Sequence, residues 1–490
     1  MSAPLSGAAA SGRAPRHVVG VALVVVLISA LWAAAAPTAS QAKAPLTTGF
    51  ADPYYLSPDD QLRDFVLEKT AATGSSIVRM NLLWRTVAPN QPLNARNPAD
   101  PGYDFSAYDG PIRDAVAHGL QPLITIYRAP IWAEGAGRPA GTPGGSWKPR
   151  PAAIADFAHA LATRYSGSFA TAEGTLPRVR LYQFWNEPNL TTYLNPQYEN
   201  GVAASPAIYR DMLNAFYGEI KAVNPDNVVI TAGTAPYGDP PNQGAGRFRP
   251  LAFWRDVLCV GQGKKKPKPI ACPVKPAFDV LAHHPINTSG GPDHSAVDPD
   301  DISTPDLGNL RDVLRAAERG NNTATAGPHQ IWATEIWWET NPPDGFEGIA
   351  VKRQARWLEQ SLYLLWKQGA RVVINLQVRD APYDKQNPFG DDQTGVFFVD
   401  GSPKLSATAW RFPFVSAKKP STKGKRLIVW GRAPVDGRLK IQRLSAGKWK
   451  QVASTKAHAG EVFQKTLKLP KNSKLRARVG GEQSLIWGGA

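Results

Sequence analysis

The stretch that decides the fold reads Leu181-Tyr182-Gln183-Phe184-Trp185-Asn186-Glu187-Pro188. Its apolar and aromatic residues are typical of a buried strand, and proline cannot donate to a β-ladder, so the strand must end there. Glu187 is therefore predicted to project from the carboxyl end of this strand. Because Trp185 would partly cover its carboxyl group, desolvation should let Glu187 keep its proton to higher pH.

A second stretch has the same design. The sequence Gln330-Ile331-Trp332-Ala333-Thr334-Glu335-Ile336-Trp337-Trp338 is again an apolar strand that leads to a glutamate among tryptophans. Two carboxyl groups presented to one cleft suit glycoside cleavage, in which one protonates the leaving oxygen and the other attacks the anomeric carbon. We therefore take Glu187 and Glu335 as the candidate catalytic pair.

Short apolar segments alternate with amphipathic helical segments between residues 47 and 410, which predicts parallel strands joined by helical crossovers. Eight such units are present, the number that closes a (β/α)8 barrel. The fourth and seventh strands then face each other across the barrel. The predicted strands are residues 47–52, 77–80, 122–126, 179–184, 228–232, 278–283, 331–334 and 372–376.

The alternative α/β architecture is an open, doubly wound sheet. No glycine-rich phosphate-binding motif follows any of the predicted strands, which disfavours that alternative. The residues in excess of a minimal barrel lie mainly after strands, in loops 129–150, 236–250, 285–305 and 381–394. Loops after strands lie on the face where barrels build their active sites, so these loops predict a walled cleft.

The last part of the chain, residues 416–490, differs in composition and charge. It holds 18 Lys and Arg against three acidic residues, a net charge of +15 out of +16 for the whole chain. Leu439 and Ile441 alternate with Lys440 and Gln442, and this period of two predicts a small β-sandwich domain after the barrel domain of residues 43–415.

Two interpretations of this basic charge stay open. The domain could bind an anionic cell-surface polymer or lipid headgroups. Alternatively, the lysines form a solvated face that keeps a small β domain soluble. Nothing in the segment resembles a nucleic-acid-binding module, so no such partner is predicted.

The first 42 residues resemble a secretory signal peptide. Arg13 and Arg16 precede the uncharged apolar run 18–36, and small residues that suit cleavage occur at Ala36 and Ala42. We therefore expect an exported, extracellular protein. The alternative is an uncleaved segment that anchors the protein in a membrane, because the run is nearly long enough to span a bilayer.

The chain has only two cysteines, Cys259 and Cys272. In an exported protein, two cysteines that flank a polar loop are expected to form a disulfide, with a pair of free thiols as the alternative. Their spacing does not suggest zinc ligands, and no metal or organic cofactor is predicted.

The motif Trp185-Asn186-Glu187-Pro188 on strand four, with Thr334-Glu335 on strand seven, resembles the clan A retaining glycoside hydrolases over about residues 47–412. Families 5 (cellulase-like) and 39 (β-xylosidase- or iduronidase-like) are the nearest. The resemblance implies cleavage of β-O-glycosidic bonds of an oligo- or polysaccharide by double displacement. Glu187 would be the acid/base and Glu335 the nucleophile.

The resemblance also assigns roles to three further residues. Asn186 would bind the sugar 2-hydroxyl, Arg79 on strand two would help to keep the nucleophile ionised, and His284 matches a histidine usual near the end of strand six. Two departures stand out. Ile286 follows His284-Pro285 where relatives often have Tyr, and strand eight, at residues 375–379, lacks the Trp that commonly forms the floor of the sugar site.

Each assignment has a structural alternative. Glu187 could be a structural carboxylate paired with a barrel arginine, and Glu339 could replace Glu335 as the nucleophile. Arg79 could form an ordinary core ion pair. Because side chains alternate along a strand, either His283 or His284 should point away from the cleft and pack.

The aromatic residues Trp132 and Trp337 lie in predicted loops at the barrel mouth, where an exposed ring could stack on a sugar. The alternative for each is packing within its own loop. For the whole chain, the alternative to an enzyme is a non-catalytic carbohydrate-binding or cell-wall protein that retains a glycosidase barrel. The departures at Ile286 and in strand eight motivate that alternative.

Overall fold

The computed structural model describes residues 45–240, 246–263, 266–387, 390, 393–418 and 426–488. The predicted signal peptide, residues 1–42, lies outside the described residues. Contacts group Pro45–Ala490 into one compact unit. Within the described part of the chain, we find no helix with the length and apolar character needed to cross a bilayer.

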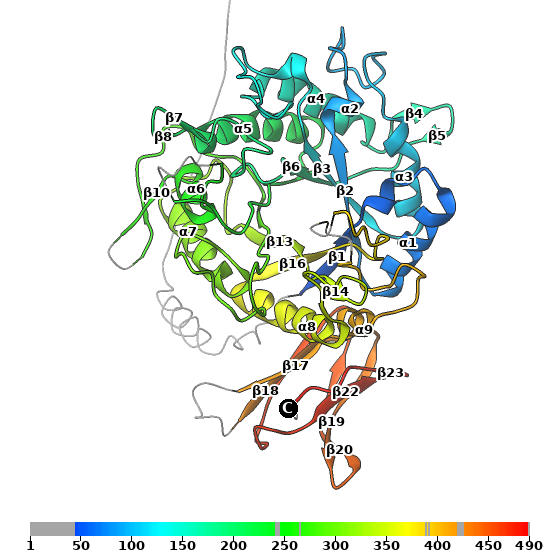
Figure 1. Ribbon diagram of the computed structural model, residues 1–490. Helices are drawn as coiled ribbons and strands as arrows, with labels where there is room; N and C mark the ends of the chain where they lie inside the picture. Colours follow the sequence, from blue (N-terminus) through cyan, green and yellow to red (C-terminus); the bar gives the residue numbers. More distant parts are fainter. Residues whose placement is uncertain are drawn as a thin grey trace, which may run out of the picture. The chain divides into compact units, whose positions relative to one another are not determined.

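Eight parallel strands form a closed barrel in the order β1-β16-β13-β12-β9-β6-β3-β2, which confirms the predicted architecture. Figure 1 shows these strands as a ring with helices around it. The strands are β1 (Thr47–Ala51), β2 (Ile77–Leu83), β3 (Gln121–Tyr127), β6 (Leu181–Phe184), β9 (Val228–Ile230), β12 (Val280–His283), β13 (Gln330–Ile336) and β16 (Ala370–Leu376).

The helices bury one apolar side against the outside of the barrel. In α7, for example, Leu310, Val313, Leu314 and Ala317 are buried at the helical spacing of three and four residues. The helices are α1 (Asp60–Ala72), α2 (Trp84–Val87), α3 (Ser106–Ala117), α4 (Pro151–Arg164), α5 (Ser205–Val223), α6 (Pro250–Val257), α7 (Leu307–Arg319), α8 (Val351–Gln368) and α9 (Leu405–Arg411).

Short strands and single turns of 3₁₀ helix shape the loops. The strand pairs are β4 (Ala170–Thr171) with β5 (Gly174–Thr175), β7 (Tyr198–Glu199) with β8 (Val202–Ala203), β10 (Val260–Gly261) with β11 (Lys268–Pro269), and β14 (Thr340–Asn341) with β15 (Ile349–Ala350). The 3₁₀ turns are Pro53–Leu56, Ile131–Ala133 and Thr304–Asp306.

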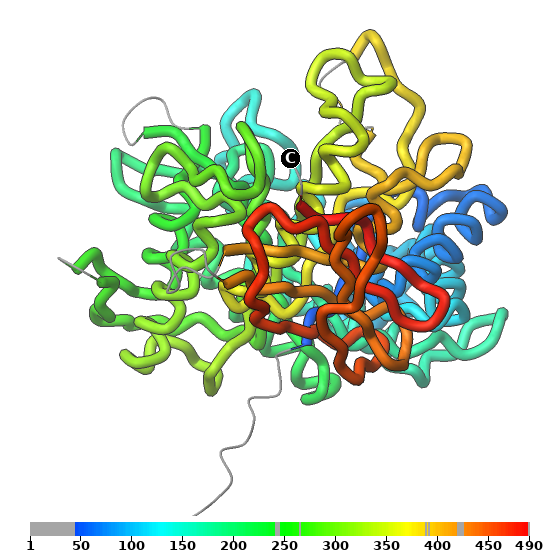
Figure 2. The backbone as a smooth tube through the Cα atoms, turned by 90° about the horizontal axis from the view of Figure 1, so that it is seen from below, coloured from blue at the N-terminus to red at the C-terminus, as the bar shows by residue number. Residues whose placement is uncertain are grey.

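The end of the chain forms two antiparallel sheets around a shared apolar core, as predicted. One sheet contains β17 (Phe414–Lys418), β18 (Leu427–Arg432) and β21 (Val462–Leu467). The other contains β20 (Lys448–Ala457), β19 (Gly437–Ser445), β22 (Leu475–Val479) and β23 (Glu482–Gln483). Figure 2 shows both sheets in orange and red. The division at residue 416 stays a prediction, and β17 already begins at Phe414.

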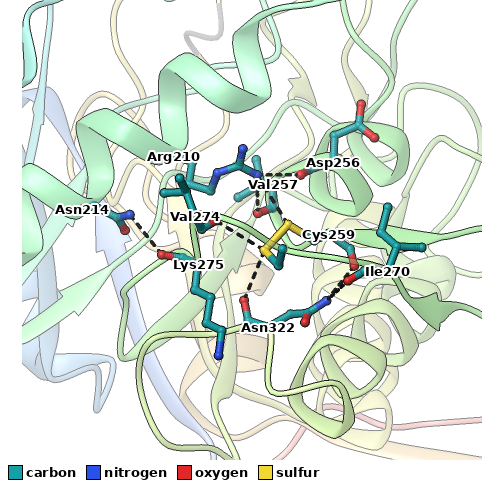
Figure 3. Close-up of a disulfide and its surroundings, with 10 residues drawn as sticks. Arg210, Asn214, Asp256, Val257, Cys259, Ile270, Val274, Lys275 and Asn322 are labelled. Carbon is teal, nitrogen blue, oxygen red and sulfur yellow. Dashed lines mark hydrogen bonds between the residues drawn. A yellow bond between two sulfur atoms is a disulfide. The ribbon is translucent and has the colours of Figure 1, made fainter.

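Cys259 and Cys272 form the predicted disulfide, with an S–S distance of 2.09 Å. Figure 3 shows Asn322 beside it. The Asn322 Nδ2 group donates to the carbonyl oxygens of Cys259 and Ile270 at 2.8 and 3.0 Å. The disulfide thus closes the segment after α6 on itself, and the Asn322 side chain connects this segment to the loop after α7.

Candidate active site

A cleft of about 740 Å³ opens at the carboxyl ends of the barrel strands. Glu187 and Glu335 both line it, together with Asn186 and Arg79. Its walls include Asn81, Tyr127, Tyr193, Tyr237, Ile286, Trp337, Trp338, Glu347 and Trp357. Residues from six of the eight strand–loop segments therefore meet in one concave surface.

Glu187 is placed by an unusual backbone path after β6. Trp185 and Glu187 have φ of 73° and 37°, in the left-handed region that non-glycine residues rarely adopt. The Glu187 amide donates to the carbonyl oxygen of Gly233 at 2.9 Å, and the Trp185 indole donates to the carbonyl oxygen of Tyr193 at 2.9 Å. These contacts hold a strained turn, a feature that clusters at functional sites.

Glu335 is placed by an irregularity in β13. Ala333 pairs with Val373 and Ile336 pairs with Asn375, so β13 contains one more residue than β16 over this interval. Such a β-bulge changes the direction of a side chain and is common beside active sites. The bulge therefore explains how a residue within a strand, rather than after it, reaches the cleft.

The imidazole of His284 lies between the two carboxylates. Its Nδ1 is 3.0 Å from Glu187 Oε1 and 3.9 Å from Glu335 Oε2. Because both oxygens contact one atom, they are at most about 7 Å apart, a bound that includes the ~5–5.5 Å carboxyl separation of retaining glycosidases. The structure thus brings together the two glutamates that are 148 positions apart in the chain.

Burial shifts the pKa values of Glu187 and His284 in opposite directions. Desolvation raises the pKa of Glu187 to about 7, although the charge of Arg79 opposes the rise. Desolvation also lowers the pKa of His284 to about 4, with Glu335 opposing and Arg79 assisting the fall. Near pH 6, Glu187 therefore carries a proton and the neighbouring imidazole is neutral.

Arg79 connects the two halves of the site. Its side chain is 2% exposed, and its Nη1 donates to Glu335 Oε2 at 2.9 Å while its Nη2 donates to Asn186 Oδ1 at 2.8 Å. The guanidinium thus fixes the rotamers of the candidate nucleophile and of the residue before the candidate acid. Arg79 therefore contacts the candidate nucleophile directly, and its functional role stays a prediction.

A buried polar layer supports Arg79 from below. Arg79 Nε donates to Gln183 Oε1 at 3.0 Å and to Thr125 Oγ1 at 3.1 Å. Gln183 Nε2 in turn donates to the carbonyl oxygen of Thr231 and to Thr334 Oγ1, each at 3.1 Å. The donors of this layer are satisfied inside the barrel, so the layer orients the residues above it.

Gly233, which follows β9, allows His284 to approach. A Cβ at this position would lie 2.1 Å from both Cδ2 and Nε2 of His284. The φ of Gly233 is not in the left-handed region, so the need for glycine here is steric. The carbonyl of the same residue accepts from the Glu187 amide, and Gly233 therefore helps to place both Glu187 and His284.

We expect Gly233→Ala to lower kcat/KM about 10- to 100-fold, because the His284 ring must move away from Glu187. The alkaline limb of the pH–rate profile should shift as well. Gly218→Ala is the matched control, since Gly218 has open space around its Cβ position. If Gly233→Ala remains as harmful in a His284→Ala background as in the wild type, a clash with this ring is not the cause.

The two tryptophans predicted to bind sugar differ in position, and one of the two adjacent histidines points away from the cleft. Trp337 lines the cleft. Trp132 does not: its ring packs edge-on to Trp84 and its Nε1 donates to the Ala88 carbonyl at 2.9 Å, so the structure gives it a role in loop packing. His283 is the histidine that points away, with its ring nitrogens 2.8 Å from Thr234 Oγ1 and 2.9 Å from the Ile302 carbonyl oxygen.

Several cleft residues had not been expected from the sequence. The segment after β13 contributes Glu347 and Ile349 in addition to Glu339, and none of the four long loops named from the sequence includes this segment. Tyr193 lies between the Tyr127 ring and the indole donor of Trp185. The tryptophan run at residues 337–338 was the signal that could have identified the first of these segments.

No cluster of three or more His, Cys, Asp or Glu residues suited to a metal ion occurs among the residues whose structure is described. The polar groups that line the cleft are carboxyl, amide and guanidinium groups together with the hydroxyl groups of tyrosine, serine and threonine and the indole nitrogens of tryptophan, and the His284 imidazole is buried beside the two glutamates. Such groups can move a proton and form a covalent bond to carbon.

No protein-family model and no curated protein matches the sequence. The solved structures similar to the chain include a family 39 glycoside hydrolase from Bacteroides cellulosilyticus, with 16% identity and a TM-score of 0.51 over 87% of this chain and 81% of that chain. A glucosidase from Croceicoccus marinus has 14% identity and a TM-score of 0.48 over 89% and 96% of the two chains. A monomeric β-xylosidase from Caulobacter crescentus has 15% identity and a TM-score of 0.47 over 89% and 96%. The chain therefore shares its fold with the family 39 glycoside hydrolase.

Proposed function

We propose that the protein is a retaining glycoside hydrolase that cleaves β-linked sugars, with Glu187 as acid/base and Glu335 as nucleophile. One observation supports the proposal: two carboxyl groups from opposite sides of the barrel line the same cleft and contact the same buried imidazole. A protonated carboxyl group and a carboxylate held by a buried arginine are the two groups that double displacement requires.

In the first step, the Glu335 carboxylate attacks the anomeric carbon and forms a glycosyl ester. The bond to the leaving oxygen breaks, and Glu187 transfers its proton to that oxygen. In the second step, ionised Glu187 takes a proton from water, the water oxygen bonds to the anomeric carbon, and the ester breaks to regenerate Glu335. Two inversions at the same carbon return the original anomer.

The neighbouring residues would bind the carbohydrate substrate. Asn186 uses its oxygen to accept from Arg79, which leaves its Nδ2 hydrogens to donate to a sugar hydroxyl. Trp337 and Tyr237 line the cleft and offer aromatic surfaces on which a sugar ring can stack. Arg247 covers one face of Tyr237 at 4.8 Å, so the opposite ring face is the one for stacking.

The proposal is tested with a panel of aryl β-glycosides of different sugars. We expect turnover of at least one member, with the product released first as the β-anomer. Glycan binding without any turnover across a broad panel would instead favour a non-catalytic carbohydrate-binding protein. Release of the α-anomer would contradict double displacement.

The pH dependence of kcat/KM follows from the pKa of Glu187. Because its pKa in the free enzyme is raised to about 7, the protonated acid is present below pH 7 and is lost as the pH rises through that value. We expect kcat/KM to fall about tenfold for each pH unit above 7. Substrates with strongly activated leaving groups, which need no proton, should not show this loss in the first step.

We also propose that the protein is exported, with a signal peptide removed by cleavage after Ala36 or Ala42, and acts outside the cell. The basic start and apolar run support this proposal, as does the disulfide between Cys259 and Cys272. N-terminal sequencing of the secreted protein should begin near Ala36 or Ala42. Retention of the apolar run would indicate the membrane anchor instead. The second proposed partner, an anionic cell-surface polymer, would bind the basic β region.

A further inference from the structure

The four-stranded sheet β20-β19-β22-β23 carries positive charge on one side. Leu439, Ile441 and Ala477 are buried in the core, so the residues that alternate with them lie on the outer side of the sheet. That outer side holds the group that we call the cationic face. The cationic face consists of Arg438, Lys440, Lys456, Arg476 and Arg478.

The cationic residues lie opposite one another across the strands. Arg438 pairs in register with Lys456, and Lys440 pairs in register with Arg478. Adjacent strands are about 4.8 Å apart, and like charges directly opposite destabilise a sheet. Two such pairs side by side are therefore an electrostatic cost that a bound anion would remove.

No acidic side chain compensates this face in the described part of the chain. Of the three acids after residue 416, Glu482 lies opposite the core residue Val479 and pairs with Arg411 of α9. Asp436 lies before β19 and contacts His458 and the Ala459 amide. The third, Glu461, comes directly before β21 in the other sheet.

The rest of the protein leaves the cationic face uncovered. Trp430 of β18, in the three-stranded sheet, packs on Tyr363 and Trp366 of α8, so the face of that sheet covers the barrel, whereas the four-stranded sheet contacts the barrel region through Glu482 of its edge strand β23. The four-stranded sheet lies on the other side of the shared core. Arg438, Lys440, Lys456 and Arg478 are exposed, and Arg476 is half-buried.

Two features of the face indicate which polyanion would bind. None of the large apolar side chains exposed in the described residues lies on this face, whereas membrane surfaces are bound with inserted apolar groups. Trp449, the aromatic ring nearby, is covered by the Arg476 guanidinium at 4.1 Å, so it is a poor platform for stacked nucleic-acid bases.

We propose that the cationic face binds a linear acidic polysaccharide that carries carboxylate or sulfate groups. The choice of a polysaccharide over other polyanions rests on the proposed glycosidase function, whereas the location of the site rests on the sheet alone. Positive side chains about 7 Å apart along a strand and about 5 Å apart across neighbouring strands can contact several anions of one extended chain. The β region would thereby hold the barrel near its substrate.

The test measures the affinity of the full chain for alginate, a carboxylated polysaccharide, and for heparin, a sulfated one, at low salt. The face variant combines Lys440→Gln, Lys456→Gln and Arg478→Gln. The matched control combines Lys268→Gln, Lys367→Gln and Lys468→Gln, which removes the same charge from exposed positions elsewhere. We expect the face variant to raise the Kd for at least one of the two polymers about tenfold or more, and the control to raise it less than about threefold.

Cleavage of aryl β-glycosides is measured on the same samples, and neither variant should change it. If glycosidase activity is absent but the face variant selectively loses polymer binding, the cationic-face inference stands without the proposed function. If neither polymer binds, or if both variants lose binding equally, the inference is wrong. Tighter binding of anionic phosphatidylglycerol vesicles or of DNA would also overturn it.

Discussion

Glu335→Ala is expected to lower kcat on aryl β-glycosides by on the order of 10⁵-fold, because the variant lacks the carboxylate that is proposed to form the glycosyl ester. Added azide should then attack the anomeric carbon directly in the space left by the carboxylate. This single displacement gives a glycosyl azide with the α configuration, the opposite anomer to the substrate. The measurement is the product anomer by proton NMR.

Glu339 is the alternative nucleophile that this experiment must exclude. It is 4% exposed and lines the same cleft, and its Oε1 lies 3.4 Å from the Gln393 amide. Glu339→Ala should yield no α-glycosyl azide. Formation of that product by Glu339→Ala, with undiminished activity in Glu335→Ala, would show that Glu339 is the nucleophile.

Glu187→Ala is expected to have an effect that depends on the leaving group. For substrates with poor leaving groups, kcat/KM should fall by on the order of 10²- to 10⁴-fold, because the leaving oxygen needs the proton of Glu187. For a dinitrophenyl glycoside, the first step should be nearly unchanged and the second step should become slow. The measurement is the dependence of kcat/KM on leaving-group pKa.

Azide also distinguishes this variant from the first. In Glu187→Ala, azide should attack the glycosyl ester on Glu335 and give a β-glycosyl azide, the same anomer as the substrate. A Glu187→Gln variant keeps the side-chain volume and serves as the control for packing. Equal losses for good and poor leaving groups would show that Glu187 is a structural carboxylate.

The fold was predictable because the same local pattern, an apolar strand followed by polar or turn residues, recurs for each strand of the barrel. Each barrel strand is an apolar segment that ends at a polar or turn residue, as Phe184 is followed by Trp185-Asn186-Glu187-Pro188. The same pattern on β13 located Glu335. The alternation around Leu439 and Ile441 likewise indicated the two-sheet region, because a period of two requires no long-range information.

The supporting residues of the site were not predictable, since their roles exist only after the barrel closes. Gln183 and Thr125 are single polar residues within apolar strands, and nothing local indicates that they meet Arg79. Gly233 matters only because His284, distant in sequence, occupies the space of its missing Cβ. The bulge at Glu335 depends on its register against β16, which no strand pattern encodes.

Trp132 is a residue that the sequence suggested for sugar binding and that the structure places in the packing of its own loop. Its position in a long loop after β3 suggested a ring exposed at the barrel mouth, but the loop packs on α2, where the indole contacts Trp84 and the Ala88 carbonyl. Sequence alone cannot tell which aromatic residues in a loop pack inward. Trp337, in the shorter segment after β13, is the one that reaches the cleft.

The most direct test of the two-glutamate mechanism is covalent trapping. The enzyme is incubated with a 2-deoxy-2-fluoro aryl glycoside of a sugar that it hydrolyses, and the labelled peptide is identified by mass spectrometry. The mechanism predicts one sugar per chain, attached through an ester to Glu335. Attachment of the sugar to Glu187 or Glu339 would contradict the mechanism. Steady turnover of the normal glycoside with release of the α-anomer, and with no trapped sugar, would also contradict it.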